Sequence, residues 1–456
     1  MRQPKTSTVN KYKRARQVAE GPATTVSSTS PTSGAMAERM AHLRLRRVNR
    51  DQVTPVPARL ADLLPSDHLA RLIWDAIMRL DLTAFYEPIV VVEGGVGQAA
   101  TDPQILVVLW TFATSQGVTS ARALDQLCVE HLAYIWLCGG VSMNYHTLSD
   151  FRIKHRQALD DLMTQVLGRL CHAGLVEFEH IAQDGMRVRA SAGAASFHRQ
   201  ATLEKCLTEA QALLASLEEP RAADAEEITA REQAAQERAA RERVERLEAA
   251  LAEMPAAQAA KRVTERGEAR VSSTDPATRV MKMPDGGFRP AYNVQFATDT
   301  AHLVITGVDV TNAGSDPSEM EPMIDQVQER CDQLPADWLM DGSFVSTPAI
   351  EAGAAKQVRV LAPVPAPKNR ERDPALALPT DSPALAEWRA RMATPEAKAT
   401  YRLRAATSEC VNAQARSRHG LLQFRVRGLI KVLCIALWIA LTHNLLIWVR
   451  HLPAWT

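Results

Sequence analysis

Two aspartates in this sequence share one local context, in which a short apolar run at the expected end of a strand is followed by Asp-Gly. They are Asp184 in the segment IAQDG and Asp341 in the segment WLMDG. If the two strands are neighbours in one sheet, the two carboxylates converge at one edge of it. Glu409, in the helical segment YRLRAATSECVNAQARSRHG, is the candidate for a third acid supplied by a packed helix.

Such a group of acids is suited to phosphodiester chemistry. Two divalent cations about 4 Å apart activate an attacking oxygen and stabilise a leaving oxygen. Because Mg²⁺ takes oxygen ligands and keeps several waters, two or three carboxylates are enough to hold it. Glycine after each aspartate lets a metal and a phosphate backbone come close. The alternative is structural, because Asp-Gly after a strand, taken alone, is most often a turn.

Basic residues near these acids are candidates for binding a phosphate backbone. Arg187 and Arg189 lie on one face if the strand continues past Asp184, and we favour DNA phosphate contacts for them over a structural ion pair. A second set, for salt-dependent phosphate binding, lies earlier in the chain: Arg44, Arg46, Arg47, Arg152, Lys154 and Arg156. For this second set an ordinary solvated surface is nearly as good an interpretation.

The composition is that of a globular protein. The chain has 456 residues, of which 46% are hydrophobic and 23% charged, with a formal net charge of +1. The charge is uneven, because residues 1–50 hold 11 Lys and Arg against 2 Glu. Seven cysteines without a CxxC pair argue against a disulfide framework or a zinc site and favour a reducing, cytoplasmic setting.

One C-terminal segment is long and apolar enough to be considered as a membrane span. It is LIKVLCIALWIALTHNLLIWV, residues 429–449. Lys431, His443 and Asn444 lie inside it. We therefore predict a buried core helix rather than a membrane anchor, and no membrane partner.

The order of elements predicts an α/β fold in several parts. Residues 1–56 form a disordered, basic arm, and residues 57–175 form a helical domain. The basic residues near the end of this domain make it the candidate for DNA binding. Residues 176–450 form a mixed-sheet catalytic domain, because strand patterns alternate with helical ones. A helical, coiled-coil-like hairpin at 199–265 interrupts this domain.

Taken in order, these segments resemble bacterial insertion-sequence transposases of the DDE superfamily. The resemblance covers most of the chain from about residue 57, and its N-terminal part is similar to the InsH-like helical domain of that family. The segments that carry it are TDPQILVVLWTFATSQG, YHTLSDFR, DGMRVRASAGAASFHR, PDGGFRPAYNVQFATD, VTNAGSDPSEMEPMI, DGSFVS and the run that begins YRLRAATSECVNAQAR.

The resemblance implies a ribonuclease H-like catalytic core with two Mg²⁺ ions, for which Mn²⁺ can substitute. Asp184, Asp341 and Glu409 then become the first, second and third catalytic and metal-binding acids. Three auxiliary residues match the signature around the glutamate: Tyr401, Arg404 and Arg416, the last at a position where the family usually has lysine. The run CVNAQAR stands where many relatives have Pro-Phe-Gly, so these auxiliary roles are less well defined than the acids.

The same resemblance implies the reaction and its partners. The protein would cleave double-stranded DNA at the terminal repeats of an insertion sequence and join the freed 3′-hydroxyl to target DNA. It would act as a homodimer on DNA, in the cytoplasm and associated with the nucleoid. Two alternatives stay open, a nuclease that only cleaves and an inactive relative that only binds DNA.

Overall fold

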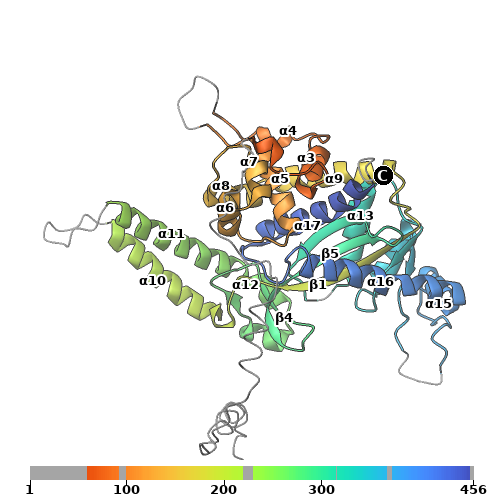
Figure 1. The fold of residues 1–456 in the computed structure, drawn as a ribbon. Helices are drawn as coiled ribbons and strands as arrows, with labels where there is room; N and C mark the ends of the chain where they lie inside the picture. The colour runs from red at the N-terminus through yellow and green to blue at the C-terminus, as the bar shows by residue number, and fades with distance from the viewer. Residues whose placement is uncertain (1–58, 92–98, 219–229, 315, 367–371, 452–456) are drawn as a thin grey trace, which may run out of the picture. The chain divides into compact units, whose positions relative to one another are not determined.

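A computed structural model describes residues 59–91, 99–218, 230–314, 316–366 and 372–451. They form a mixed α/β structure in which helices flank one large sheet (Figure 1). The predicted basic arm at 1–56 lies outside the described residues, and so do Arg44, Arg46 and Arg47.

The described residues before the sheet are helical. Their elements are η1 (Leu60–Asp62), α3 (Leu69–Ile77), α4 (Thr83–Tyr86), α5 (Pro103–Ser115), α6 (Ala121–Glu130), α7 (Leu132–Cys138), α8 (Tyr145–Lys154) and α9 (Arg156–His172). Side-chain caps fix several of the starts. Asp102 accepts from the backbone N–H of Gln104, with Pro103 in the first turn, and Asn144 accepts from two backbone N–H groups at the start of α8.

Six strands form the main sheet, and two short ones form a separate pair. The six are β1 (His180–Arg189), β4 (Arg279–Lys282), β5 (Phe288–Asp299), β6 (Ile305–Thr311), β7 (Asp337–Leu339) and β8 (Arg359–Leu361), in the order β4-β5-β1-β7-β8 with β6 also on β5. The separate pair is β2 (Phe197–His198) and β3 (Val271–Ser272). β5 is antiparallel to β1, β4 and β6, whereas β1, β7 and β8 are parallel. Helices α13 (Met320–Cys331) and α14 (Thr347–Ala355) precede β7 and β8.

Strand β1 continues past the point where the sequence suggested that it ends. It pairs with β5 from Ile181 to Arg189, so Gly185 lies inside a strand and not in a turn. On its other side β1 pairs with β7 only as far as Ala182. Beyond that point α16 (Pro395–Ser417) packs against β1, after α15 (Pro383–Ala393). Asp184 therefore lies in the middle of β1, two residues beyond the point where the pairing of β1 with β7 ends.

Helix α17 (Leu429–Arg450) lies between the N-terminal helices and the sheet, where it packs against α5, α9 and β6 (Figure 1). Within the described residues it is the one helix long and apolar enough to cross a membrane, and 89% of its most apolar stretch is buried inside the protein. Asn444 holds it to β6, accepting from Ile305 N at 2.9 Å and donating to Ile305 O at 2.7 Å. The placement agrees with the predicted core helix.

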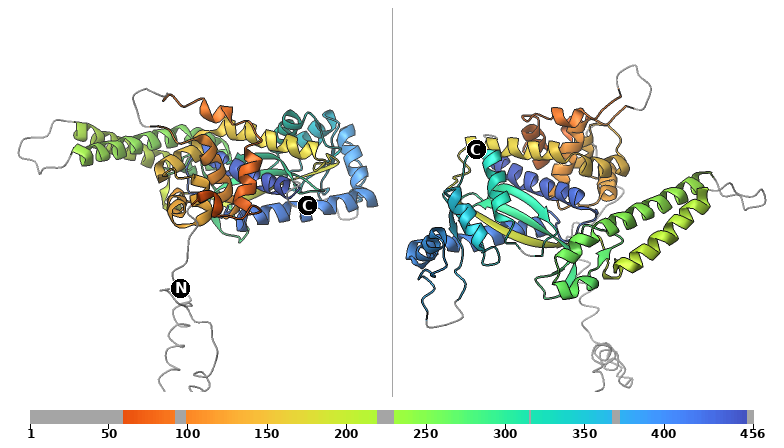
Figure 2. Two further views of the ribbon diagram at one scale, coloured as in Figure 1. Left: turned by 45° about the horizontal axis from the view of Figure 1, so that its top comes forward. Right: turned by 180° about the vertical axis from the view of Figure 1, so that it is seen from behind.

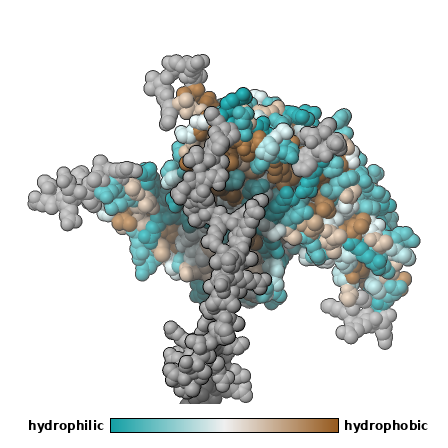
Figure 3. Space-filling view, in the orientation of Figure 1, coloured by the Kyte–Doolittle hydropathy of each residue, from teal (hydrophilic) through white to brown (hydrophobic). Residues whose placement is uncertain are grey.

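The charged segment after β2 folds into two helices that run side by side (Figure 2), α10 (Gln200–Glu218) and α11 (Ala230–Ala252). Leu203, Val244 and Leu247 belong to a small apolar cluster of their own, and α12 (Met254–Ala259) and η3 (Val263–Glu268) follow. Hydrophilic residues predominate on the face of this hairpin in Figure 3. One hydrophobic core includes both α3–α9 and the sheet, so the division into helical, catalytic and inserted domains stays a prediction.

Candidate active site

The structure brings Asp184 and Asp341 beside each other. The parallel pairing of β1 with β7 ends at Ala182 opposite Leu339, and two further residues in each segment bring the two aspartates level. Their charges interact, because the Asp341 carboxylate raises the pKa of Asp184. On its other side Asp184 is paired with Phe296 of β5, which fixes its backbone.

Asp184 is a partly buried carboxylate whose two oxygens face Arg404 and Asn412. Its side chain is 22% exposed, and burial is the main reason that its pKa rises to about 6. Arg404, whose Nη1 lies 3.8 Å from Oδ1, opposes this rise, and Asp341 adds to it. The Asn412 amide donates to Oδ2 at 2.9 Å. Any further positive charge beside this carboxylate would stabilise its ionised form.

Asp341 is oriented by the turn that follows it. The backbone N–H and the hydroxyl of Ser343 lie 2.6 Å and 2.5 Å from its Oδ1. The same hydroxyl lies 3.0 Å from Oδ2 of Asp316, a buried acid just before α13. No local pattern in the sequence singles out Asp316 as a site residue. Its segment, SDPSEMEP, resembles a helix start, and only the pairing of distant strands shows that the carboxylate faces inward.

Glu409, the predicted third acid, lies on the exposed side of α16. The side chains that α16 presents to Asp184 are those of Arg404 and Asn412. Glu409 is three residues before Asn412 and therefore adjacent to it on the helix surface. In the described part of the chain, no three His, Cys, Asp or Glu side chains are grouped so that they could hold a metal ion. The structure thus brings two of the three predicted acids together, and it adds Asn412, which lay unselected inside the run CVNAQAR.

Arg187 and Arg189 of β1 differ in their contacts. Arg187 donates to the carbonyl oxygens of Lys282 at 3.2 Å and Gly314 at 3.1 Å, so its guanidinium ties β1 to neighbouring segments. This use differs from the DNA phosphate contact favoured from the sequence. Arg189, on the same strand face, is exposed.

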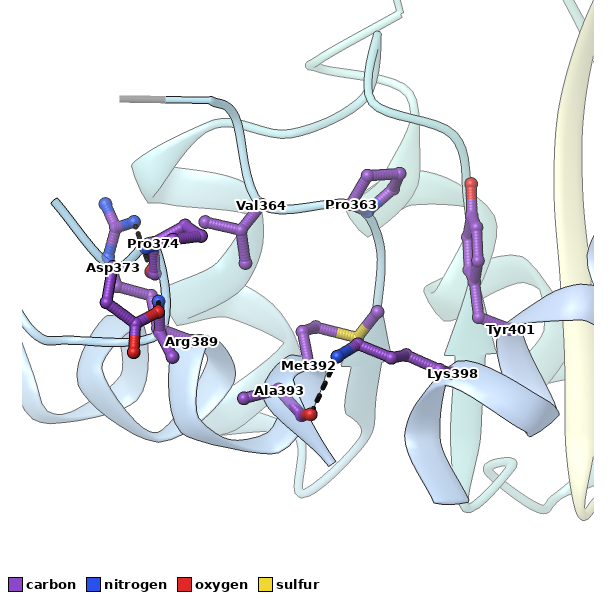
Figure 4. Close-up of a pocket in the computed structure, with 10 residues that line it drawn as sticks. Pro363, Val364, Asp373, Pro374, Arg389, Met392, Ala393, Lys398 and Tyr401 are labelled. Carbon is purple, nitrogen blue, oxygen red and sulfur yellow. Dashed lines mark hydrogen bonds between the residues drawn. The ribbon is translucent and has the colours of Figure 1, made fainter. Parts of the chain in front are cut away.

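The auxiliary residues of α16 are spread along the helix. The Tyr401 ring centroid lies 6.0 Å from the Arg404 guanidinium carbon. Tyr401 also lines a cavity of about 320 Å³ whose other walls include Pro363, Val364 and Met392 (Figure 4). The cavity is mostly apolar, which suits packing better than ion binding. Arg416 is partly exposed near the end of the helix.

Of the second basic set, Arg152 does not lie on the surface as expected. It is buried, donates to Thr119 O at 2.6 Å, and its guanidinium carbon lies 4.4 Å from the ring centroid of Trp110. Burial lowers its pKa to about 10. Lys154 and Arg156 are exposed, and Lys154 forms an ion pair with Asp150 at 2.6 Å. A solvated surface therefore describes these two at least as well as a phosphate site.

Comparison with known families gives two matches. Residues 58–154 match a family described as transposase domain (DUF772), and residues 369–447 match a family described as transposase DDE domain. The second match contains Arg404, Glu409 and Asn412, and the first spans α3 to α8. Neither the curated proteins nor the solved structures contain a match to this chain.

Proposed function

We propose that this chain cleaves DNA at the ends of an insertion sequence and joins the freed 3′-hydroxyl to target DNA, because residues 58–154 and 369–447 match two transposase families. The two matches confirm the family resemblance and support a function in transposition. The observation that carries the proposed chemistry is the pair of carboxylates, Asp184 and Asp341, at the point where β1 and β7 part.

The strand order supports a ribonuclease H-like core. Three antiparallel strands, β6, β5 and β1, continue into two parallel ones, β7 and β8, so that the first strand in the sequence is central. In such a sheet the end of β7 and the middle of β1 meet, and a helix from the C-terminal part can close the site. Helix α16 has that place here.

DDE transposases generally use divalent metal ions, and the two carboxylates fit such ions. They offer oxygen ligands, which Mg²⁺ and Mn²⁺ accept, and Mg²⁺ often binds through one or two carboxylates plus substrate phosphates. Asp184 and Asp341 would hold the metal, with Glu409 as the third ligand that the resemblance implies. When bound, the ions activate the attacking oxygen and stabilise the leaving one.

The chain's own residues orient these acids. Asn412 donates to Asp184 and fixes its rotation, while Ser343 holds Asp341 through its backbone N–H and hydroxyl. Arg404 places a positive charge beside Asp184. Positioning and charge stabilisation of this kind provide most of the catalysis in phosphoryl transfer, because little covalent chemistry is left to the protein.

A surface for DNA follows α16. After Glu409 the chain has no further Asp or Glu, but it has six basic residues: Arg416, Arg418, Arg425, Arg427, Lys431 and Arg450. Arg425 and Arg427 are exposed on the loop between α16 and α17, and Gln423 of this loop forms a bridge with Arg189 at the end of β1. We infer that this loop binds the phosphate backbone of double-stranded DNA next to the end of β1, and that two protomers act on paired ends in the nucleoid.

Purified protein and labelled DNA carrying the flanking ends of its own genomic locus would test the proposal, with Mg²⁺ or Mn²⁺. Asp184→Asn and Asp341→Asn should abolish nicking and joining while end binding persists. Glu409→Gln and Asn412→Ala separate the two candidates on α16, because the residue that ligates metal should cause the larger loss.

A second pair of variants tests the DNA surface. Arg425→Glu with Arg427→Glu should weaken binding of all DNA sequences and flatten its salt dependence, since phosphate contacts release counterions. Arg238→Glu with Arg243→Glu, both exposed on α11, serves as the matched double charge reversal. Nicking without joining would indicate a nuclease instead, and binding without either reaction would indicate an inactive relative.

A further inference from the structure

Asp316 is a buried acid that the proposed reaction does not use. It is 5% exposed. It contacts Asn293 and Gln295, which point to the face of β5 opposite to Phe296, the residue paired with Asp184. Its Oδ1 accepts from the amides of Asn293 at 2.6 Å and Gln295 at 2.9 Å. These two residues alternate along β5 and therefore share one face. The two amide donors compensate for the cost of burying this carboxylate.

Gly185, the residue after Asp184, makes room for this carboxylate. A Cβ at position 185 would lie 2.8 Å from Asp316 Oδ1 and 2.6 Å from Gln295 Nε2. The glycine of the Asp-Gly pair is thus needed for space behind the strand. Asp316 Oδ1 therefore occupies the space next to the β1 backbone that a side chain at position 185 would fill.

Ser343 connects Asp316 to the other acid. Its hydroxyl lies 3.0 Å from Asp316 Oδ2 and 2.5 Å from Asp341 Oδ1. The turn that contains it is otherwise open to solvent, because Gly342 and Ser343 are exposed. The Ser343 hydroxyl is therefore a contact that joins the Asp341 turn to a carboxylate fixed in the interior.

We propose that Asp316 is a positioning residue that sets the spacing of Asp184 and Asp341, through the backbone at Gly185 and through the Ser343 hydroxyl. The inference rests on the proposed function, in which that pair holds divalent cations. Ser343 contacts the ligand Asp341 directly, and residues of that kind typically change metal affinity by about 10- to 100-fold when they are mutated. Asp316 lies one contact further away, behind Ser343. Asp316 therefore acts on the metal through Ser343 and Gly185, and it touches neither metal nor DNA.

The test measures binding of Mn²⁺ alone to the full-length protein, by electron paramagnetic resonance and calorimetry. Asp316→Asn and Ser343→Ala should each weaken Mn²⁺ binding by about 10-fold or more. The loss in the double variant should be smaller than the sum of the two single losses in free energy, because both substitutions interrupt the connection through Ser343. Ser343→Thr keeps the hydroxyl and should bind nearly as wild type does. Glu319→Gln removes a nearby acid with no contact to Ser343 in the described structure, and it is the matched control.

Each outcome decides one point. Wild-type Mn²⁺ affinity in both Asp316→Asn and Ser343→Ala would overturn the positioning role while leaving the metal site intact. Additive losses would overturn the connection through Ser343. If the wild type binds no Mn²⁺ and Asp184→Asn does not differ from it, the metal site of the proposed function fails, and this inference fails with it. If Asp316→Asn does not fold, the comparison of Ser343→Ala with Ser343→Thr still tests the connection, because Ser343 is exposed.

Discussion

Replacing Asp184 with asparagine should make the metal-free protein more stable at neutral pH. Burial raises the pKa of this carboxyl to about 6, from an ordinary value of 3.8. The folded protein thus binds the proton more tightly than the unfolded chain does. This contribution to stability is complete below the unfolded-state pKa, and it is lost as the pH rises through the folded-state pKa.

The size of the effect follows from the two pKa values. Each pH unit between 3.8 and about 6 removes roughly 1.4 kcal/mol, so the wild type loses about 3 kcal/mol between acid and neutral pH. Asparagine carries no charge at any pH, and its carbonyl can still accept from Asn412. The difference in unfolding free energy should therefore move by about 3 kcal/mol in favour of Asp184→Asn between about pH 4 and about pH 7.

Urea unfolding with a chelator present, followed by circular dichroism across this pH range, measures the difference. Asp150→Asn is the control, because Asp150 is exposed and its loss should change stability by no more than about 0.5 kcal/mol. Adding Mn²⁺ at neutral pH should stabilise the wild type and not Asp184→Asn, since only a ligand that binds the folded state shifts the equilibrium. If the difference in unfolding free energy between the wild type and Asp184→Asn does not change with pH, the raised pKa of Asp184 is refuted. If Mn²⁺ stabilises both proteins equally, the metal site at Asp184 is refuted.

Three other substitutions test the surroundings of the site. Asn444→Leu leaves both backbone groups of Ile305 buried without their partner, and urea unfolding should show a loss of about 2–6 kcal/mol; a loss below about 1 kcal/mol would contradict this. Burial lowers the pKa of His419 to about 4, so its contribution to stability is present above its ordinary pKa of 6.5 and is lost as the pH falls toward 4, by about 3 kcal/mol. The variant His419→Gln should not show that loss in the same titration, and parallel curves for the two proteins would refute the assignment. Gly185→Ala would overlap the polar side chains behind it and should impair cleavage, whereas Gly193→Ala, with open space around it, should not; equal activities would show that position 185 tolerates a side chain.

Local sequence patterns predicted the elements that carry the site. The strands containing Asp184 and preceding Asp341 follow from short apolar runs, and the final core helix follows from an apolar segment interrupted by polar residues. The suggestion that the two strands are neighbours came from a repeated Asp-Gly, and the parallel pairing of β1 with β7 agrees with it.

What the sequence did not reveal depends on register and on the opposite face of the sheet. The structural alternative placed Gly185 in a turn, but Gly185 pairs with Gln295 in the middle of β1. Asp316 and Arg152 illustrate the same limit, because a charged residue in a polar segment predicts exposure and both are buried. Their partners come from strands or helices far away in the chain, and no local pattern encodes those contacts.

The third metal ligand is expected on α16, and a double substitution tests which position of this helix supplies it. Glu409 precedes Asn412 by three residues, so at 3.6 residues per turn the two side chains differ by roughly 60° around the helix axis. A carboxylate at 412 would face Asp184 directly, since the Asn412 amide nitrogen already lies 2.9 Å from Oδ2. In protein made inactive by Glu409→Gln, adding Asn412→Asp should therefore restore Mn²⁺ binding and part of the nicking. If it restores neither, the third ligand must come from position 409 itself, and α16 has to turn when metal and DNA bind.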